Sequence, residues 1–456
     1  MRLLPLLAIT AVLSSAHAHA DELDDKIARE MARRHVPGVS VLVIRDGKVI
    51  KEKGYGYANV EHNVPVDEKT VFQSGSVGKT FTAALVMLLA EDGKLSLDDP
   101  ISRHLANTPP EWAGITIRHL LTHTSGLGDP YTVLDFRKDY EDEELIALEA
   151  RIPVLFAPGE RFSYSNMGYH LLGFICNKAG GKFYADQLQE RIFAPLGMGT
   201  RIISEADIVP HRAAGYEWKD GALRNQSWVA PKLNTTADGS LYLTARDLAK
   251  WDRALYGDAI LNARIRAASW TPPKLANGRA SGYGYGWEID ERNGHRLLSH
   301  GGSWQGFKSQ ISRYVDDKFT VIVLANSASA RPGKFADMVA GHFMPALAVA
   351  PAKAIPDTSP AVAARLRTAI ASLIANKQPA GLTPAVAKVF EPATVARFST
   401  GLKELGELKS SELLSHKDEA GASSYRYRFI FAGDVLIVTC QINQEGQISA
   451  LRMFPE

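Results

Sequence analysis

Two residues three positions apart could form a nucleophile and its base. Ser76 and Lys79 stand in Ser-Val-Gly-Lys, at the start of a nearly continuous apolar run over residues 77–91 that stops at Gly93. Residues three apart share one face of a helix, so the Lys79 amine can approach the Ser76 hydroxyl. Serine needs a base to take its proton, and lysine can act as one only if its pKa falls from about 10.4. The pair therefore predicts nucleophilic catalysis, although Ser-x-x-Lys alone is a common pattern.

A second candidate is Tyr164 with Asn166. The two flank one residue and precede a helical pattern over 167–178, so both can point from a loop into one cleft. A tyrosine there could relay a proton, and an asparagine amide could hold both a lysine and a substrate carbonyl. The alternative is a structural pair, with Tyr164 packed on the core and Asn166 capping the helix. The residues alone leave both interpretations open.

The third candidate is the run His300, Gly301, Gly302 and Ser303. It stands where one strand pattern ends and the next begins. Two glycines weaken a strand and usually mark the close approach of another backbone or a ligand. A bulge or loose turn is the structural alternative. We treat these four residues as candidates for substrate binding.

Strand patterns at both ends of a domain must position these motifs. Residues 39–45 and 48–57 surround Asp46-Gly47, a two-residue hairpin signal, and residues 295–299, 305–315 and 318–326 form a second antiparallel set. Helical patterns and loops lie between the two sets. The order predicts an α+β domain over residues 21–347, with an antiparallel sheet closed by both domain termini, flanking helices and an inserted, mostly helical region.

A second domain is expected after a linker. Residues 348–360 contain three prolines and little periodicity. Beyond it, residues 361–456 contain a helical pattern followed by alternating strands at 425–432, 434–443 and 447–454. We expect a small α+β accessory domain there.

The first 20 residues have the layout of a secretory signal. Arg2 gives a positive start, residues 3–13 are apolar, and residues 16–18 or 18–20 give a small-x-small cleavage site followed by acidic residues. The apolar run is shorter than the roughly 20 residues that span a bilayer. We expect a cleavable signal peptide over residues 1–20, a periplasmic or secreted protein, and no stable membrane span.

Composition excludes several partners. The 456 residues include 52 Lys and Arg against 50 Asp and Glu, a net charge of +2 without a long basic block, so we expect no nucleic acid as a partner.

Cys176 and Cys440 are expected to be separate buried thiols. His119 and His123 are four apart, but the residues between them lack the metalloprotease glutamate, and we expect no metal. No cofactor is predicted.

The three motifs together, in this order, resemble the penicillin-binding protein and serine β-lactamase superfamily. The resemblance is to the class C β-lactamase-like branch, which includes D-Ala-D-Ala carboxypeptidases, D-amino-acid peptidases and family VIII esterases. Leu-Leu-Thr-His-Thr-Ser-Gly-Leu at 120–127 and Pro-Gly-Glu-Arg-Phe-Ser-Tyr-Ser-Asn at 158–166 look like hallmarks of that branch. The resemblance covers residues 24–345 and does not extend to the C-terminal module.

The resemblance implies a role for each matching residue. Ser76 would be the acylated nucleophile, Lys79 its base or base partner, Tyr164 the general base for acylation and deacylation, and Asn166 a polar clamp. The backbone N–H groups of Ser76 and Ser303 would form the oxyanion hole.

One residue departs from the superfamily pattern. His300-Gly301-Gly302 stands where the β-lactamase pattern has Lys-Thr-Gly or Lys-Ser-Gly, whose lysine receives the substrate carboxylate. Histidine is partly charged at best near neutral pH. The departure weakens the case for an efficient β-lactamase and favours a peptidase or esterase.

The sequence therefore predicts a secreted serine hydrolase that works through a Ser76 acyl-enzyme. Its substrate would be a small molecule or peptide carrying an amide or ester: a D-aminoacyl peptide, a β-lactam or a small ester, with peptidoglycan-derived compounds among the candidates. The alternative is a non-catalytic protein of the same fold that binds peptidoglycan fragments or penicillin. The complete Ser-Lys-Tyr-Asn set argues against the alternative, since a binder needs no nucleophile. The oligomeric state stays open.

Overall fold

The computed structural model describes residues 10–201, 207–350, 352–419 and 421–455. The chain divides into two compact units, Met1–Val349 and Ala350–Glu456. Their boundary lies within the segment predicted to be a linker. Residues 1–9 of the predicted signal peptide lie outside the described residues, and the first helix, α1 (Thr10–Arg33), begins inside it. Among the described residues, no helix is long and apolar enough to cross a membrane.

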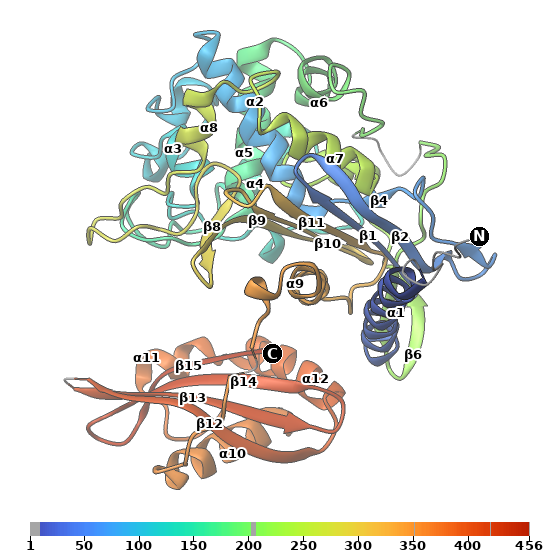
Figure 1. The fold of residues 1–456 in the computed structure, drawn as a ribbon. Coiled ribbons are helices and arrows are strands. Elements are labelled where there is room, and N and C mark those ends of the chain that lie inside the picture. Colours follow the sequence, from blue (N-terminus) through green and yellow to red (C-terminus); the bar gives the residue numbers. More distant parts are fainter. Residues whose placement is uncertain (1–9, 202–206, 351, 420, 456) are drawn as a thin grey trace, which may run out of the picture. The chain divides into compact units, whose positions relative to one another are not determined.

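A seven-stranded antiparallel sheet organises the first unit, in the order β3-β2-β1-β11-β10-β9-β8 (Figure 1). Val39 near the start of the domain pairs with Ala325 near its end, so the two termini close the sheet as predicted. Asp46 and Gly47 both have a positive φ, which a tight hairpin turn between β1 and β2 requires. The strands are β1 (Gly38–Arg45), β2 (Lys48–Asn59), β3 (Val64–Pro65), β8 (Glu288–Arg292), β9 (His295–Trp304), β10 (Phe307–Tyr314) and β11 (Phe319–Ala325).

Helices cover both faces of this sheet (Figure 1). Leu42 and Ile44 of β1 belong to the core under the inserted helices, whereas Val41 and Val43 belong to a second core that α1 and α9 share. Burial on both faces explains why β1 is almost continuously apolar. The helices are α2 (Lys79–Glu91), α3 (Ile117–Leu121), α4 (Asp142–Glu149), α5 (Asn166–Gly180), α6 (Tyr184–Leu188), α7 (Ala245–Ala254), α8 (Ala263–Ser269) and α9 (Pro332–Phe343).

Helix α2 is the central helix of the first unit. Its residues from Lys79 to Leu89 are all buried, as expected for a helix that is apolar all round. It ends where predicted, because Gly93 adopts a left-handed φ of 68° just beyond Glu91. A short 3₁₀ turn, η1 (Gly75–Gly78), leads directly into it. Two short ladders complete the unit, β4 (Phe72–Gln73) with β7 (Tyr242–Leu243) and β5 (Tyr216–Lys219) with β6 (Ala222–Asn225).

The second unit is an α+β module with its own core. Its four strands form a meander in chain order, and Leu366, Tyr427 and Val438 are among the residues that bury its apolar face. The first strand was not predicted, because residues 408–419 are mostly polar. The elements are α10 (Pro360–Ile374), α11 (Pro384–Val389), α12 (Pro392–Glu404), β12 (Leu408–Glu419), β13 (Ala422–Phe431), β14 (Val435–Asn443) and β15 (Ile448–Pro455).

A chain cut at about Pro351 is expected to fold and to react at Ser76 as the full-length chain does. Every candidate catalytic residue precedes the cut, and the second unit buries a separate core. Soluble yield, melting curve and labelling by a fluorophosphonate probe check this. Loss of soluble expression in the truncated chain would argue that the two units share a core.

Candidate active site

Ser76 and Lys79 meet at the start of the central helix. Ser76 lies half-buried in η1, and Lys79 is the first residue of α2. The Lys79 Nζ donates to the Ser76 Oγ at 2.9 Å, although the Lys79 side chain is 0% exposed. The contact that the three-residue spacing predicted is therefore present, and the amine is shielded from water.

Three acceptors surround the Lys79 amine. Besides Ser76, its Nζ donates to the Asn166 Oδ1 at 2.8 Å and to the Asp238 backbone carbonyl at 2.6 Å. Burial lowers the pKa of Lys79 to about 8, against the opposing charges of Asp238 and Asp129. A substantial fraction of Lys79 is therefore the free amine at mildly alkaline pH, the form that can accept a proton from serine.

Asn166 faces Lys79 because another residue caps its helix. The Ser165 side chain accepts from the Gly168 backbone N–H at the start of α5, so Ser165 is the N-cap. The alternative interpretation of Asn166 as the cap is wrong. Its amide oxygen is engaged with Lys79 instead.

Tyr164 lies beside the same amine. The Lys79 Nζ is 5.0 Å from the centre of the Tyr164 ring. The buried Tyr164 hydroxyl has no well-aligned hydrogen-bond partner among the described residues. Burial raises the pKa of Tyr164 well above its usual range, and the nearby Ser76 hydroxyl opposes this only in part. Tyr164 is thus a neutral phenol in this state, whereas a general base would need to be a tyrosinate.

His300 lies near Tyr164 but does not supply the positive charge that a lysine would carry there. Its side chain is 1% exposed, its ring centre is 6.3 Å from that of Tyr164, and its Nε2 is 2.8 Å from the Tyr283 hydroxyl. Burial, together with the charge of Lys79, lowers the pKa of His300 to about 3. His300 is therefore neutral near neutral pH, which agrees with the expectation that a histidine here is partly charged at best.

The glycines of the third motif lie inside a strand rather than between two strands. β9 continues through Gly301 and Gly302 to Trp304. A Cβ on Gly302 would lie 2.0 Å from the Ser74 carbonyl oxygen, and a Cβ on Gly75, whose φ is +48°, would lie 2.4 Å from the Ser303 backbone nitrogen. These backbone segments therefore lie against each other, and Ser76 and Ser303 line the same small pocket.

A small pocket opens beside the nucleophile. Its volume is only about 10 Å³, and Ser76, Asp238, Gly239, Ser303 and Trp304 are among its lining residues. The Trp304 ring belongs to an aromatic cluster that also contains Tyr131 and Phe136, at ring-centre distances of 6.2 and 6.0 Å. One side of the pocket is therefore suited to apolar groups.

The two paired histidines of the sequence serve separate structural roles. His119 lies in the capping box at the start of α3, where its Nδ1 accepts from the Thr116 N–H. His123 is buried, accepts from the Ser165 N–H at 3.1 Å and packs 4.1 Å from the Tyr164 ring. His123 therefore supports the position of Tyr164.

Sequence reasoning missed the residues behind Lys79. Asp238 carries one of the three acceptors of the amine, and its carboxylate contacts the buried His170, which contacts the buried Glu149. The three come from segments far apart in the chain. The only signals were an Asp-Gly turn and a lone histidine in an apolar helix pattern.

Comparison with known proteins finds relatives that match about two thirds of the chain. Penicillin-binding protein 4* of Bacillus subtilis (strain 168) is 31% identical over 318 residues, 65% of this chain and 69% of that protein. Protein flp of Staphylococcus aureus (strain MW2) is 28% identical over 322 residues, and the match spans 67% of this chain and 62% of that protein.

Two solved structures show the same fold. The octameric penicillin-binding protein homologue from Pyrococcus abyssi has a TM-score of 0.65 at 26% identity and covers 96% of both chains. That likeness includes the second unit, to which the sequence resemblance did not extend. D-amino acid amidase from Ochrobactrum anthropi SV3, complexed with D-phenylalanine, has a TM-score of 0.62 at 27% identity over 72% of this chain and 98% of its own. The family model described as Beta-lactamase matches residues 23–341, and the chain belongs to that family, within the serine β-lactamase and penicillin-binding protein superfamily.

Proposed function

We propose that the protein is a secreted serine hydrolase that opens amide or ester bonds of small substrates through an acyl-enzyme on Ser76. The observation that carries the proposal is the 2.9 Å contact between the Ser76 Oγ and the buried Lys79 Nζ. The relatives named above as penicillin-binding proteins and as a D-amino acid amidase support this class of activity. Secretion rests on the predicted signal over residues 1–20.

Lys79 is the base for acylation in this proposal. As the free amine it takes the Ser76 proton while Oγ attacks the carbonyl carbon of the substrate, giving a tetrahedral oxyanion and a Lys79 ammonium. The oxyanion is placed between the backbone N–H groups of Ser76 and Ser303, and such donors are worth about 3 kcal/mol each in other serine hydrolases.

Collapse of the intermediate breaks the bond to the leaving group. The Lys79 ammonium returns its proton to the departing nitrogen or oxygen, with the neutral Tyr164 phenol as the relay. Water then attacks the Ser76 ester and loses its proton to Lys79, and Lys79 returns that proton to the Ser76 Oγ as the acid leaves. Asn166 holds the amine in place through both steps.

The favoured substrate has no carboxylate facing His300. Neutral His300, hydrogen-bonded to Tyr283, cannot attract an anion as a lysine would. The aromatic cluster at Trp304 favours an apolar side chain on the substrate. D-aminoacyl amides and small esters therefore fit better than β-lactams or peptides with a free terminal carboxylate.

Substitution of His300 by lysine is expected to improve kcat/KM for an anionic substrate relative to a neutral ester. The lysine would add the missing positive charge. In the wild type, the ratio of the two kcat/KM values should stay constant between pH 5 and 8, because His300 is neutral throughout that range. A wild-type ratio that falls as the pH rises through about 6.5 would show instead that His300 titrates beside the substrate.

A panel of D-phenylalanine amide, a p-nitrophenyl ester, nitrocefin and a D-Ala-D-Ala peptide tests the activity, with Ser76→Ala as the control. We expect turnover of the amide or ester that the control lacks. Absence of turnover on the whole panel, together with absence of fluorophosphonate labelling, would favour the non-catalytic binding protein.

A further inference from the structure

We propose that Asp238 is a positioning residue for Lys79: its backbone carbonyl holds the amine beside Ser76, and its carboxylate, fixed by a buried network that ends at Glu149, tunes the charge of that amine. The inference rests on the proposed function and assigns the tuning of Lys79 to residues that act through its amine rather than on the substrate.

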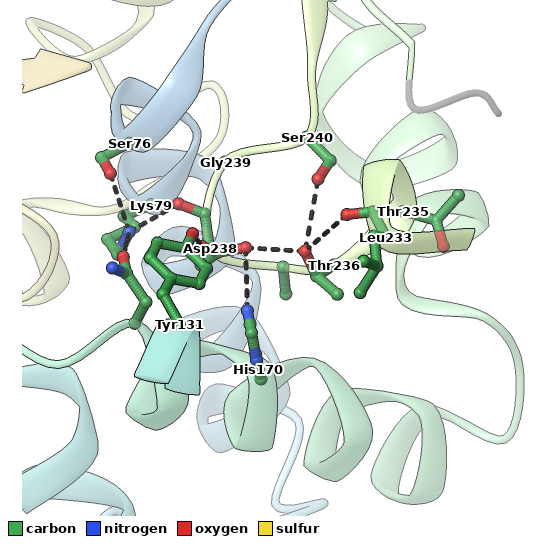
Figure 2. Close-up of polar contacts among 12 residues, drawn as sticks. Ser76, Lys79, Tyr131, His170, Leu233, Thr235, Thr236, Asp238, Gly239 and Ser240 are labelled. Carbon is green, nitrogen blue, oxygen red and sulfur yellow. Dashed lines mark hydrogen bonds and ion pairs between the residues drawn. The ribbon is translucent and has the colours of Figure 1, made fainter. Parts of the chain in front are cut away.

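The geometry around Asp238 couples its two ends (Figure 2). Asp238 is buried, and its carbonyl accepts from Lys79 at 2.6 Å. Tyr131 donates to the Oδ2 at 2.8 Å, Thr236 donates to the Oδ1 at 2.7 Å, and the His170 Nε2 lies 3.3 Å from the same Oδ1. These contacts to both carboxylate oxygens restrain the loop that places the Asp238 carbonyl beside the amine.

The network continues into the protein beyond His170. The His170 Nδ1 lies 2.6 Å from the Glu149 Oε1, and both side chains are almost completely buried. Glu149 is the last residue of α4, His170 lies in α5, and Asp238 lies in the loop before β7. A line of titratable residues therefore runs from Glu149 at the end of α4 through His170 and Asp238 to Lys79 at the start of α2. Burying such groups is costly even when they are paired, and a well-packed apolar set often serves stability equally well.

The neighbouring residues set the protonation states along this line. Burial alone would lower the pKa of His170, but Asp238 and Glu149 outweigh it and raise the pKa to about 10. Burial alone would raise the pKa of Asp238, but His170 and Lys79 outweigh it and lower that pKa. An imidazolium thus stands behind an Asp238 carboxylate at neutral pH. Burial raises the pKa of Glu149 at the far end of the line.

Asp238 is one of the two charged residues that set the pKa of Lys79. His123 and His300, whose pKa values are lowered by burial and by the charge of Lys79, are neutral. Asp238 and Asp129 are the charges that raise the pKa of Lys79 against burial. Among the described residues, Ser76, Tyr164, Asn166 and Tyr169 also lie against the amine, and these four are uncharged.

Two substitutions should move the titration of Lys79 in opposite directions. Asp238→Asn removes the anion, so the pKa of Lys79 should fall. In a plot of the rate of Ser76 labelling by a fluorophosphonate against pH, the rise at low pH (the acidic limb) should therefore move down by about one pH unit. His170→Gln removes the cation that screens Asp238, so the limb should move up. Thr236→Val is the matched control, since it removes one hydrogen bond to the same carboxylate and keeps the charge; its limb should stay in place.

Labelling rates between pH 5 and 10, with melting curves for each variant, decide the question. Opposite shifts for Asp238→Asn and His170→Gln support the inference. If both variants fold and their acidic limbs do not shift, the inference is overturned. A network that only stabilises the packing of α4 and α5 would change the melting curve alone. If Asp238→Asn does not fold, the direction of the His170→Gln shift decides. Failure of wild-type labelling at Ser76 would contradict the proposed function itself, whereas wild-type labelling with unshifted limbs contradicts only this inference.

Discussion

Replacing Ser76 by alanine is expected to lower kcat/KM for an amide or ester substrate by roughly 10⁴- to 10⁶-fold, the range seen when a serine hydrolase loses its nucleophile. The reason is local: Ser76 Oγ is the hydroxyl that Lys79 contacts within the pocket lined by Ser303 and Trp304. The Ser76 side chain is half-buried, so the melting curve should change little.

Steady-state kinetics of the purified variant check this prediction. Ser102→Ala is a suitable control, because Ser102 is an exposed serine outside the pocket and its loss should leave turnover intact. Residual activity of the Ser76→Ala variant above about 1% of wild type would mean that another group carries the acyl chemistry.

The second large effect concerns Lys79 and pH. The rate of acylation should rise with pH and level off above about 8, since the pKa of Lys79 is lowered to about 8 by burial and only the free amine can take the Ser76 proton. Below that pH the ammonium dominates and the rate should fall tenfold per unit. Lys79→Ala should lower kcat/KM by at least about a hundredfold.

Tyr164→Phe separates the two candidate bases. We expect it to lower kcat/KM by at least about a hundredfold through loss of the relay, while the acidic limb stays near pH 8 because Tyr164 is neutral across the range. Disappearance of the limb in Tyr164→Phe would instead assign the base to the tyrosine. Near-wild-type turnover in either Lys79→Ala or Tyr164→Phe would remove that residue from the mechanism.

The main features of the fold could be predicted from local patterns. The apolar run of α2 and the Asp46-Gly47 turn are properties of neighbouring residues, and both occur where expected. The sequence was less informative where the local structure depends on contacts with backbone segments far away in the chain. Gly302 lies within β9, where the Ser74 carbonyl leaves no room for a side chain, and no local pattern distinguishes that from a break between strands.

The candidate site shows the same division. The predicted contact between Ser76 and Lys79 follows from spacing on a helix, and Asn166 reaches Lys79 through the cap that Ser165 provides. The charge of His300 could not be predicted, because it depends on burial and on the nearby Lys79. Asp238 was overlooked for a similar reason, since its carbonyl contact is a property of the folded loop and not of its residue type.

The most direct test of the central claim is to trap the acyl-enzyme and locate it. The protein is mixed with a p-nitrophenyl ester or with penicillin, quenched in acid, and examined by intact-mass measurement and peptide mapping. A single adduct on the peptide that contains Ser76, absent from Ser76→Ala, is the predicted result. An adduct on any other residue, or one that persists in Ser76→Ala, would contradict the assignment of Ser76 as the nucleophile.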